Sequence, residues 1–196
     1  MSQPALGTDH PVGLIVTDDL VRSRLTVFFR YLLAIPHLIW LYLWGILVFV
    51  AVFFAWLTAL FTGRVPDGMQ TFIASYLNYT THVYAYLLLI ANPYPPFNGG
   101  PGYPVDVSIA AAQPQSRLTV FFRLFLAIPA LFLTSVFRSV NGIIAFLGWF
   151  YALFTGRMSL GMRDLSAWLL RYEVQTYAYV LLLTGRYPSL AGAPSV

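Results

Sequence analysis

The sequence contains no cysteine and no lysine among its 196 residues. The absence of cysteine excludes disulfide bonds, thiolate metal ligands and a cysteine nucleophile, and the absence of lysine excludes Schiff-base chemistry. Charged residues make up only 9% of the chain, whereas globular proteins carry about 25%. So few charges cannot cover the surface of a soluble domain of this size. The composition therefore favours a polytopic membrane protein.

Acidic residues are also scarce, because Asp and Glu together number seven. The sequence has no HExxH motif, nucleophile elbow, phosphate-binding loop or pair of carboxylates within an apolar segment, and its three histidines are scattered. We therefore expect a non-enzymatic protein with no cofactor and no metal site. The net charge of +4 comes from arginines at the ends of apolar segments, which indicates membrane topology rather than nucleic-acid binding.

What the chain does contain is a duplication. Residues 24–97 align with residues 117–190 at an offset of 93 positions without a gap, and 32 of the 74 aligned pairs are identical. Hydrophobic residues make up 59% of the chain, and its mean hydropathy is +0.71. Two similar units predict two similar structural modules related by a pseudo-symmetry axis.

Each unit is predicted to contain an interfacial helix followed by two membrane spans. In the first unit these are 24–36, 37–61 and 69–91, and a helix running unbroken from 25 to 61 would be about 55 Å long against about 30 Å of hydrocarbon. We therefore expect a break at Pro36, because proline removes a helix hydrogen bond. The second unit repeats the plan at 117–129, 130–154 and 162–184, with Pro129 at the break.

The predicted fold is thus an all-α membrane protein of two helical hairpins, with four transmembrane helices. Glycines of Thr-Gly-Arg sequences follow the first span of each unit, at Gly63 and Gly156, and the last span, at Gly185. Glycine can take the left-handed conformation that ends a helix.

The segments outside the repeats, 1–23 and 98–116, each contain a candidate short strand. In 105–109, Val and Ile alternate with Asp and Ser, which is the period-two pattern of a half-buried strand, and 11–17 is its first copy. The sequence leaves open whether the two strands pair. The connector between the two units, residues 92–104, is rich in proline and glycine and cannot continue a helix. The tail at 191–196 is predicted to be disordered.

Two crossings per unit would bring both units into the membrane from the same side, with the pseudo-twofold axis along the membrane normal. Arginines are more frequent on the side of the termini (Arg22, Arg24, Arg30, Arg117, Arg123, Arg186) than on the hairpin side (Arg64, Arg157, Arg163). The positive-inside rule then predicts that both termini are cytoplasmic.

Arg138 and Glu173 are ionisable residues within the predicted spans of the second unit. A charge in mid-membrane costs about 2.5 to 3.5 kcal/mol, so such a residue is usually paired or functional. Their counterparts in the first unit are Gly45 and Thr80, so both charges are missing together. We expect an ion pair that acts as a structural clasp; a gating or proton-coupled role and the absence of contact remain alternatives.

Polar residues also form a stripe on the second span of each hairpin. Asn78, His82 and Tyr86 recur at i, i+4 and i+8, and Arg171, Gln175 and Tyr179 hold the equivalent positions. Such a stripe must face protein or water. It predicts either interhelical hydrogen bonds within or between copies of the chain or a path for a hydrophilic ligand or ion.

Four arginines are expected at the membrane interface: Arg24 and Arg30 in the first unit, Arg117 and Arg123 in the second. Contact with lipid headgroups is the ordinary interpretation of such residues. Selective binding of an anionic lipid between the two units is the sharper alternative.

The run RLTVFFR…LAIP, the FTGR that ends the long apolar segment, and the YxYLLL and YP sequences that follow resemble a bacterial membrane family described only as a domain of unknown function. In that family the unit occurs singly or in tandem. The resemblance covers both repeats and implies a small polytopic inner-membrane protein. It supplies no activity, ligand or catalytic residue.

The expected function is therefore a scaffold, an accessory subunit or a lipid-organising module in the bacterial cytoplasmic membrane. Its expected partners are membrane lipids, anionic ones among them, and further subunits in a homo-oligomer or larger membrane complex. The alternative is a small channel or transporter with a polar path near Arg138, Glu173 and His82. The alternative requires those residues to line one water-accessible cavity.

Overall fold

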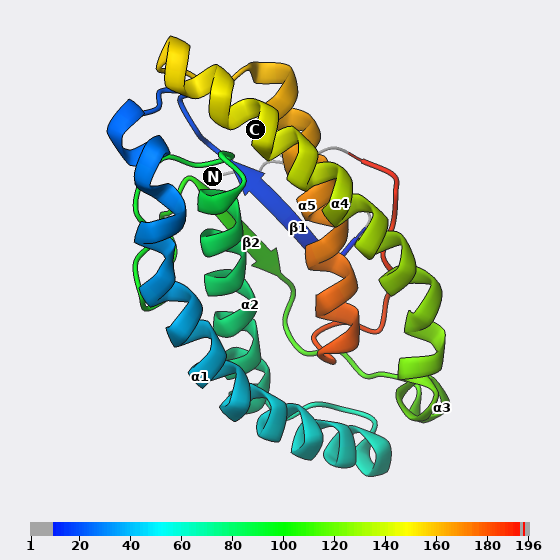
Figure 1. Ribbon diagram of the computed structural model, residues 1–196. Coiled ribbons are helices and arrows are strands. Elements are labelled where there is room, and N and C mark those ends of the chain that lie inside the picture. The colour runs from blue at the N-terminus through cyan, green and yellow to red at the C-terminus, as the bar shows by residue number, and fades with distance from the viewer. Residues whose placement is uncertain (1–9, 193, 195–196) are drawn as a thin grey trace, which may run out of the picture.

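The computed structural model describes residues 10–192 and residue 194 (Figure 1). Its elements follow in the order β1 (Val12–Val16), α1 (Arg24–Thr62), α2 (Asp67–Leu87), β2 (Val105–Ile109), α3 (Arg117–Phe121), α4 (Arg123–Thr155) and α5 (Leu160–Val180). The fold is mostly helical, and each repeat forms a helical hairpin. The predicted disorder of the tail concerns residues that lie partly outside the described part of the chain.

The long helices do not break at their prolines, contrary to the prediction. α1 continues through Pro36 and α4 through Pro129. Residues on both sides of Pro36 are held in place, because Ala34 and His37 are buried and the Tyr94 hydroxyl donates to the Leu33 carbonyl at 3.2 Å. This packing outweighs the one hydrogen bond that proline removes. The predicted interfacial helices are thus continuous with the helices that follow, except at Phe122, which separates α3 from α4.

The ends of the first helix of each hairpin agree with the sequence. Gly63 and Gly156 take left-handed conformations with φ of 77° and 71°, and each glycine amide donates to a carbonyl of the last helical turn. The predicted end of the last helix at Gly185 is wrong. α5 ends at Val180, and the left-handed residue after it is Leu182, with φ of 66°. Leu89 has the equivalent conformation after α2.

The two strands pair, and they do so on the symmetry axis. β1 and β2 are antiparallel, with Leu14 opposite Val107. These two residues are equivalent in the 93-residue offset, so the pseudo-twofold axis passes between them. β1 packs against α5 and β2 against α2, which means that each strand covers the second helix of the other repeat.

Tryptophans join the repeats in the same reciprocal way. Trp56, near the end of α1, donates its indole N–H to the Val120 carbonyl at 3.1 Å, and the equivalent Trp149 of α4 donates to the Val27 carbonyl at 2.9 Å. The start of each long helix therefore lies beside the end of the other. The two long helices run in opposite directions, as Figure 1 shows.

The apolar residues are distributed unequally over the helices. α1 and α4 form the outer sides of the molecule, with α2 and α5 between them (Figure 1). Among the described helices, α1 and α4 are long and apolar enough to cross a membrane, and their most apolar stretches are only 17% and 22% buried. α2 and α5 are largely buried and carry the polar stripes. By length and composition, two of the described helices are thus candidate spans, and the four predicted spans stay a prediction.

Candidate functional site

Arg138 and Glu173 come together in the structure. Arg138 Nη2 lies 3.6 Å from Glu173 Oε1, and the Arg138 guanidinium covers the ring of Tyr84 at 4.7 Å from its centroid. The Glu173 side chain is 7% exposed and that of Arg138 is 45% exposed. Because Tyr84 belongs to α2, the contact joins the second hairpin to the first repeat.

We expect Arg138→Leu to destabilise the protein more than the double substitution Arg138→Leu/Glu173→Leu. The single change leaves a buried carboxylate without its partner, at a cost of about 2 kcal/mol, below the usual range for buried pairs because Arg138 is half exposed. The double change removes both charges. SDS-induced unfolding in mild detergent measures the difference, and a double variant less stable than the single one contradicts the clasp.

The polar stripe of α2 faces β2 and the connector before it. His82 Nε2 lies 2.7 Å from Asp106 Oδ1, and Asn78 accepts a hydrogen bond from the Val107 amide at 3.0 Å. Asn78 also donates to the Gly99 carbonyl at 3.1 Å. These side chains fix the strand and the connector to the helix.

The stripe of α5 makes the equivalent contacts on the other side of the axis. Gln175 donates to the Val12 carbonyl of β1 and accepts from the Ser189 amide, both at 3.0 Å. Arg171 donates to the Ser189 carbonyl at 3.3 Å. His82, Gln175 and the Arg138–Glu173 pair are thus held in three separate sets of contacts, with different partners in each.

Arg30 and Arg123 are buried, which corrects their interpretation as interfacial residues exposed to the headgroups of bulk lipid. Each is 1% exposed. Arg30 donates to the carbonyls of Tyr86 and Ala91 and lies 4.3 Å from the Tyr86 ring centroid. Arg123 repeats this with Tyr179 and Thr184, at 4.5 Å from the Tyr179 ring. The two arginines therefore bind carbonyls in the last turns of α2 and α5 and in the segments that follow them, whereas Arg24 and Arg117 are exposed.

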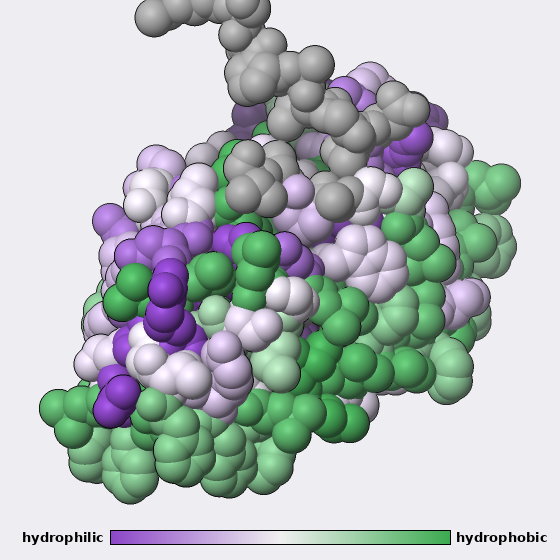
Figure 2. Space-filling view, turned by 90° about the horizontal axis from the view of Figure 1, so that it is seen from above, coloured by the Kyte–Doolittle hydropathy of each residue, from purple (hydrophilic) through white to green (hydrophobic). Residues whose placement is uncertain are grey.

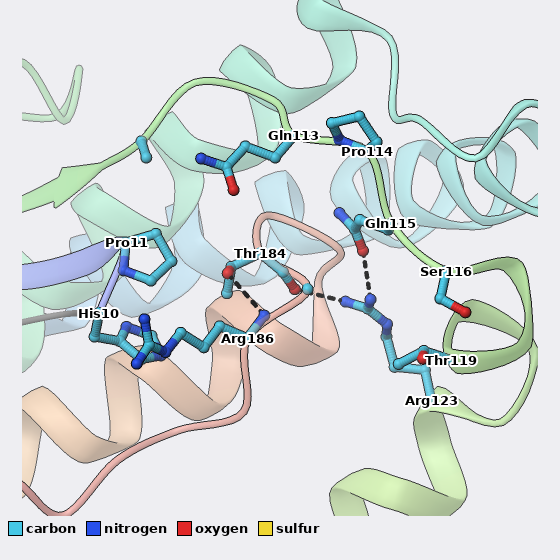
Figure 3. A pocket seen from close by; sticks show the side chains of 12 residues that line it. His10, Pro11, Gln113, Pro114, Gln115, Ser116, Thr119, Arg123, Thr184 and Arg186 are labelled. Carbon is cyan, nitrogen blue, oxygen red and sulfur yellow. Dashed lines mark hydrogen bonds between the residues drawn. The ribbon is translucent and has the colours of Figure 1, made fainter.

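Arg123 also backs a polar cavity of about 600 Å³ (Figure 3). The side chains that give the cavity its chemistry are His10, Gln113, Ser116, Thr119, Thr184 and Arg186. In Figure 3, His10 and Arg186 lie at one end and Arg123 at the other, with Thr184 between them. None of the described lining residues is acidic. Burial lowers the pKa of His10, and the positive charges of Arg186 and Arg171 lower it further.

Arg123 also lines an apolar groove of about 560 Å³. Its walls include Phe49, Phe53 and Trp56 of α1, Phe121 and Leu124 at the start of the second repeat, and Leu181 after α5. Arg123 is the described residue that lines both the cavity and the groove. A cation thus lies at the boundary of a polar and an apolar site, an arrangement suited to an anionic amphiphile.

Sequence reasoning singled out Arg123 but not the cavity beside it. The residues that line the cavity are ordinary by type, and they come from three separate segments, 10–11, 110–123 and 184–186. The available signal was a difference between the repeats, because the positions of Asp18 and Arg22 hold Ala111 and Gln115 in the second repeat.

Comparison with curated proteins and with solved structures gave no match. The comparison with protein families did, and it locates the same two units as the internal alignment. Since the model of the family described as a domain of unknown function (DUF4389) matches residues 24–98 and again residues 117–191, the chain belongs to this family and carries its domain twice.

Proposed function

We propose that this protein is a non-enzymatic membrane module that lies within one leaflet of the bilayer and organises lipid around it. The apolar outer surface of α1 and α4 carries this proposal. Phe49, Phe125 and Phe154 are 76%, 72% and 78% exposed, and many other large apolar residues of these helices are exposed with them. Soluble monomers rarely expose apolar patches of such extent.

The distribution of hydropathy supports a one-sided immersion. In Figure 2 hydrophobic residues gather along the lower and right-hand edges, and the lower edge is the side that faces the viewer in Figure 1. Hydrophilic residues gather on the left and toward the upper edge of Figure 2. In Figure 1 the sheet lies behind α2 and α5, on the side away from the viewer. Exposed arginines at the ends of α1 and α4 suit the headgroup level; these are Arg24, Arg64, Arg117 and Arg157.

The chain path favours helices parallel to the membrane over helices that cross it. The Gln115 amide, just ahead of α3, donates to the Gly63 carbonyl at the end of α1 at 2.7 Å. If all helices crossed, the connector from 88 to 116 would have to cross too. Irregular backbone exposed to lipid is not tolerated at that depth. With helices in the membrane plane, α1 has no need of a break, and the pseudo-twofold axis still lies along the membrane normal.

Labelling of single cysteines distinguishes the two topologies, because the natural chain has none. Asp67→Cys after α1 and Asn98→Cys in the connector both place the thiol at an exposed position. We expect a membrane-impermeant maleimide to label both from the same side of sealed vesicles. Four crossing helices would place the two positions on opposite sides, and labelling from opposite sides would overturn the in-plane arrangement. Extraction of the chain by alkaline carbonate would overturn its immersion in lipid.

The expected location in the bacterial cytoplasmic membrane and the assembly with other subunits stay predictions. The alternative of a channel or transporter has less support, because His82, Gln175, Arg138 and Glu173 bind protein groups in three separate places.

A further inference from the structure

The two repeats differ where a buried arginine meets the end of the second helix. In the first repeat, Arg22 and Asp18 form an ion pair of 2.6 Å, with side chains 0% and 1% exposed. The Asp18 carboxylate also attracts the nearby Arg30 guanidinium electrostatically. The first repeat therefore supplies its own anion beside the buried arginines.

The second repeat keeps the buried arginine and loses this anion. Arg123 corresponds to Arg30, but Ala111 and Gln115 stand where the first repeat has Asp18 and Arg22. Among the described residues, Arg123 contacts two carbonyls, an amide oxygen and an aromatic ring, all of them neutral. A buried cation without a counter-charge is costly. The polar cavity beside Arg123 provides the space for an external anion.

The apolar groove shows a second difference between the repeats. Gly45 lines the groove, and its counterpart in the second repeat is Arg138, whose long side chain lies over Tyr84. The Tyr76 side chain packs against Gly45, where an added Cβ would lie 3.1 Å from the Tyr76 hydroxyl. The groove is lined mainly by Phe, Trp, Leu and Val, which offers nothing to a free inorganic anion and suits a hydrocarbon chain.

We infer that the second repeat binds an anionic phospholipid, with its phosphate in the polar cavity beside Arg123 and Arg186 and one acyl chain in the apolar groove. The inference rests on the proposed function, since the lipid enters from the leaflet in which the protein lies. Ser116 and Thr119 supply hydroxyl donors for the phosphate oxygens, and Arg186 supplies an exposed guanidinium. The α3–α4 junction lies between head and chain, because Thr119 lines the cavity and Phe121 the groove.

Quenching of tryptophan fluorescence by brominated lipid tests this inference, because Trp56 lines the groove. The full chain is placed in vesicles that contain a small fraction of either brominated phosphatidylglycerol or brominated phosphatidylcholine. We expect phosphatidylglycerol to quench preferentially, and Trp56→Phe to remove the preference. Trp149→Phe, the equivalent change in the other repeat, should retain it. Equal quenching by both lipids would overturn the headgroup site while leaving immersion in the membrane intact, whereas no quenching by either would refute the proposed function itself.

Charge variants separate the site from general attraction to an anionic surface. Arg186→Gln should lower the preference for phosphatidylglycerol about tenfold, as expected for one lost charge-assisted hydrogen bond. Arg157→Gln removes the same charge from an exposed position outside the cavity and should leave the preference unchanged. Equal losses in both variants would overturn the inference. Competition by water-soluble glycerol phosphate as effective as that by the lipid would also overturn it, in favour of a soluble phosphate site.

A final variant introduces the buried ion pair of the first repeat into the second repeat. Ala111→Asp/Gln115→Arg introduces the Asp18–Arg22 pair at the equivalent positions, where the Leu182 carbonyl takes the place of the Leu89 carbonyl that Arg22 binds. We expect this internal carboxylate to abolish the phosphatidylglycerol preference without loss of stability. Retention of the full preference in a folded variant would show that the lipid phosphate does not use this cavity. If Arg186→Gln does not fold, Ser116→Ala/Thr119→Val replaces it, and an unchanged preference counts against the inference.

Discussion

Replacing Arg30 with leucine is expected to lower the free energy of unfolding by about 3 kcal/mol. The Ala91 carbonyl, which follows α2, loses the guanidinium that binds it, and a buried acceptor without a partner costs about 1 to 3 kcal/mol. The Tyr86 carbonyl loses the same donor but keeps the Leu89 amide. The stacking of the guanidinium on the Tyr86 ring is lost as well. Removal of a buried charge offsets part of this loss, which is why the expected value is not larger.

Three further variants test whether the loss of stability comes from the specific contacts of Arg30. Arg30→Lys keeps the charge, but one ammonium group cannot reproduce the planar fork that reaches the Ala91 carbonyl and the Asn92 side chain together, so we expect about 2 kcal/mol of loss. Arg123→Leu should behave like Arg30→Leu. Arg24→Leu, on an exposed position of the same helix, should change stability by less than about 0.5 kcal/mol. SDS-induced unfolding followed by circular dichroism gives these values. Equal effects at Arg24 and Arg30 would show that the contacts of Arg30 with the end of α2 do not stabilise the fold.

Helix ends that depend on local conformation were predictable, and those that depend on tertiary contacts were not. Gly63 and Gly156 end their helices in the left-handed conformation, which glycine adopts without strain. Leu89 adopts the same conformation despite its side chain, and its carbonyl accepts a hydrogen bond from Arg22 at 2.9 Å. Nothing in the sequence around Leu89 shows that an arginine 67 residues earlier will hold it.

The duplication predicted two equivalent modules but not their relative direction. The offset of 93 residues is equally consistent with units that run side by side and with units that run in opposite directions. The direction is set by contacts between the repeats, such as Trp56 with Val120, whose partners are separated by 64 residues. The expectation of a break at Pro36 failed for a related reason, because it assumed that the helix must match the bilayer thickness.

The candidate site was predictable where two residues change together. The joint replacement of Gly45 and Thr80 by Arg138 and Glu173 indicated a contact, and the structure brings the two charges to 3.6 Å. The polar cavity left no such signal within one repeat. Its lining residues are spread along the sequence from His10 to Arg186. Its interpretation as an anion site depends on comparison with Asp18, a carboxylate that only the first repeat has.

Replacing Asp18 with alanine is expected to destabilise the protein by about 3 kcal/mol. The Arg22 side chain is fully buried. Loss of the Asp18 carboxylate leaves its guanidinium with carbonyl groups as partners among the described residues, including those of Leu89 and Ile90. Breaking one half of a buried ion pair usually costs about 3 to 5 kcal/mol, and the carbonyl partners limit the loss here. Asp19→Ala, which removes only one exposed hydrogen bond to the Val21 amide, should cost less than about 1 kcal/mol.

The double variant Asp18→Ala/Arg22→Gln is expected to recover most of that stability. It reproduces the residues Ala111 and Gln115, and the second repeat shows that the same backbone accepts them, with Gln115 donating to the Leu182 carbonyl at 2.8 Å. Removing both charges leaves no buried ion without a partner. If the double variant unfolds as easily as Asp18→Ala, the loss of stability does not come from a buried Arg22 without its carboxylate partner. The comparison of the repeats would then no longer explain why one holds an internal carboxylate and the other an open cavity.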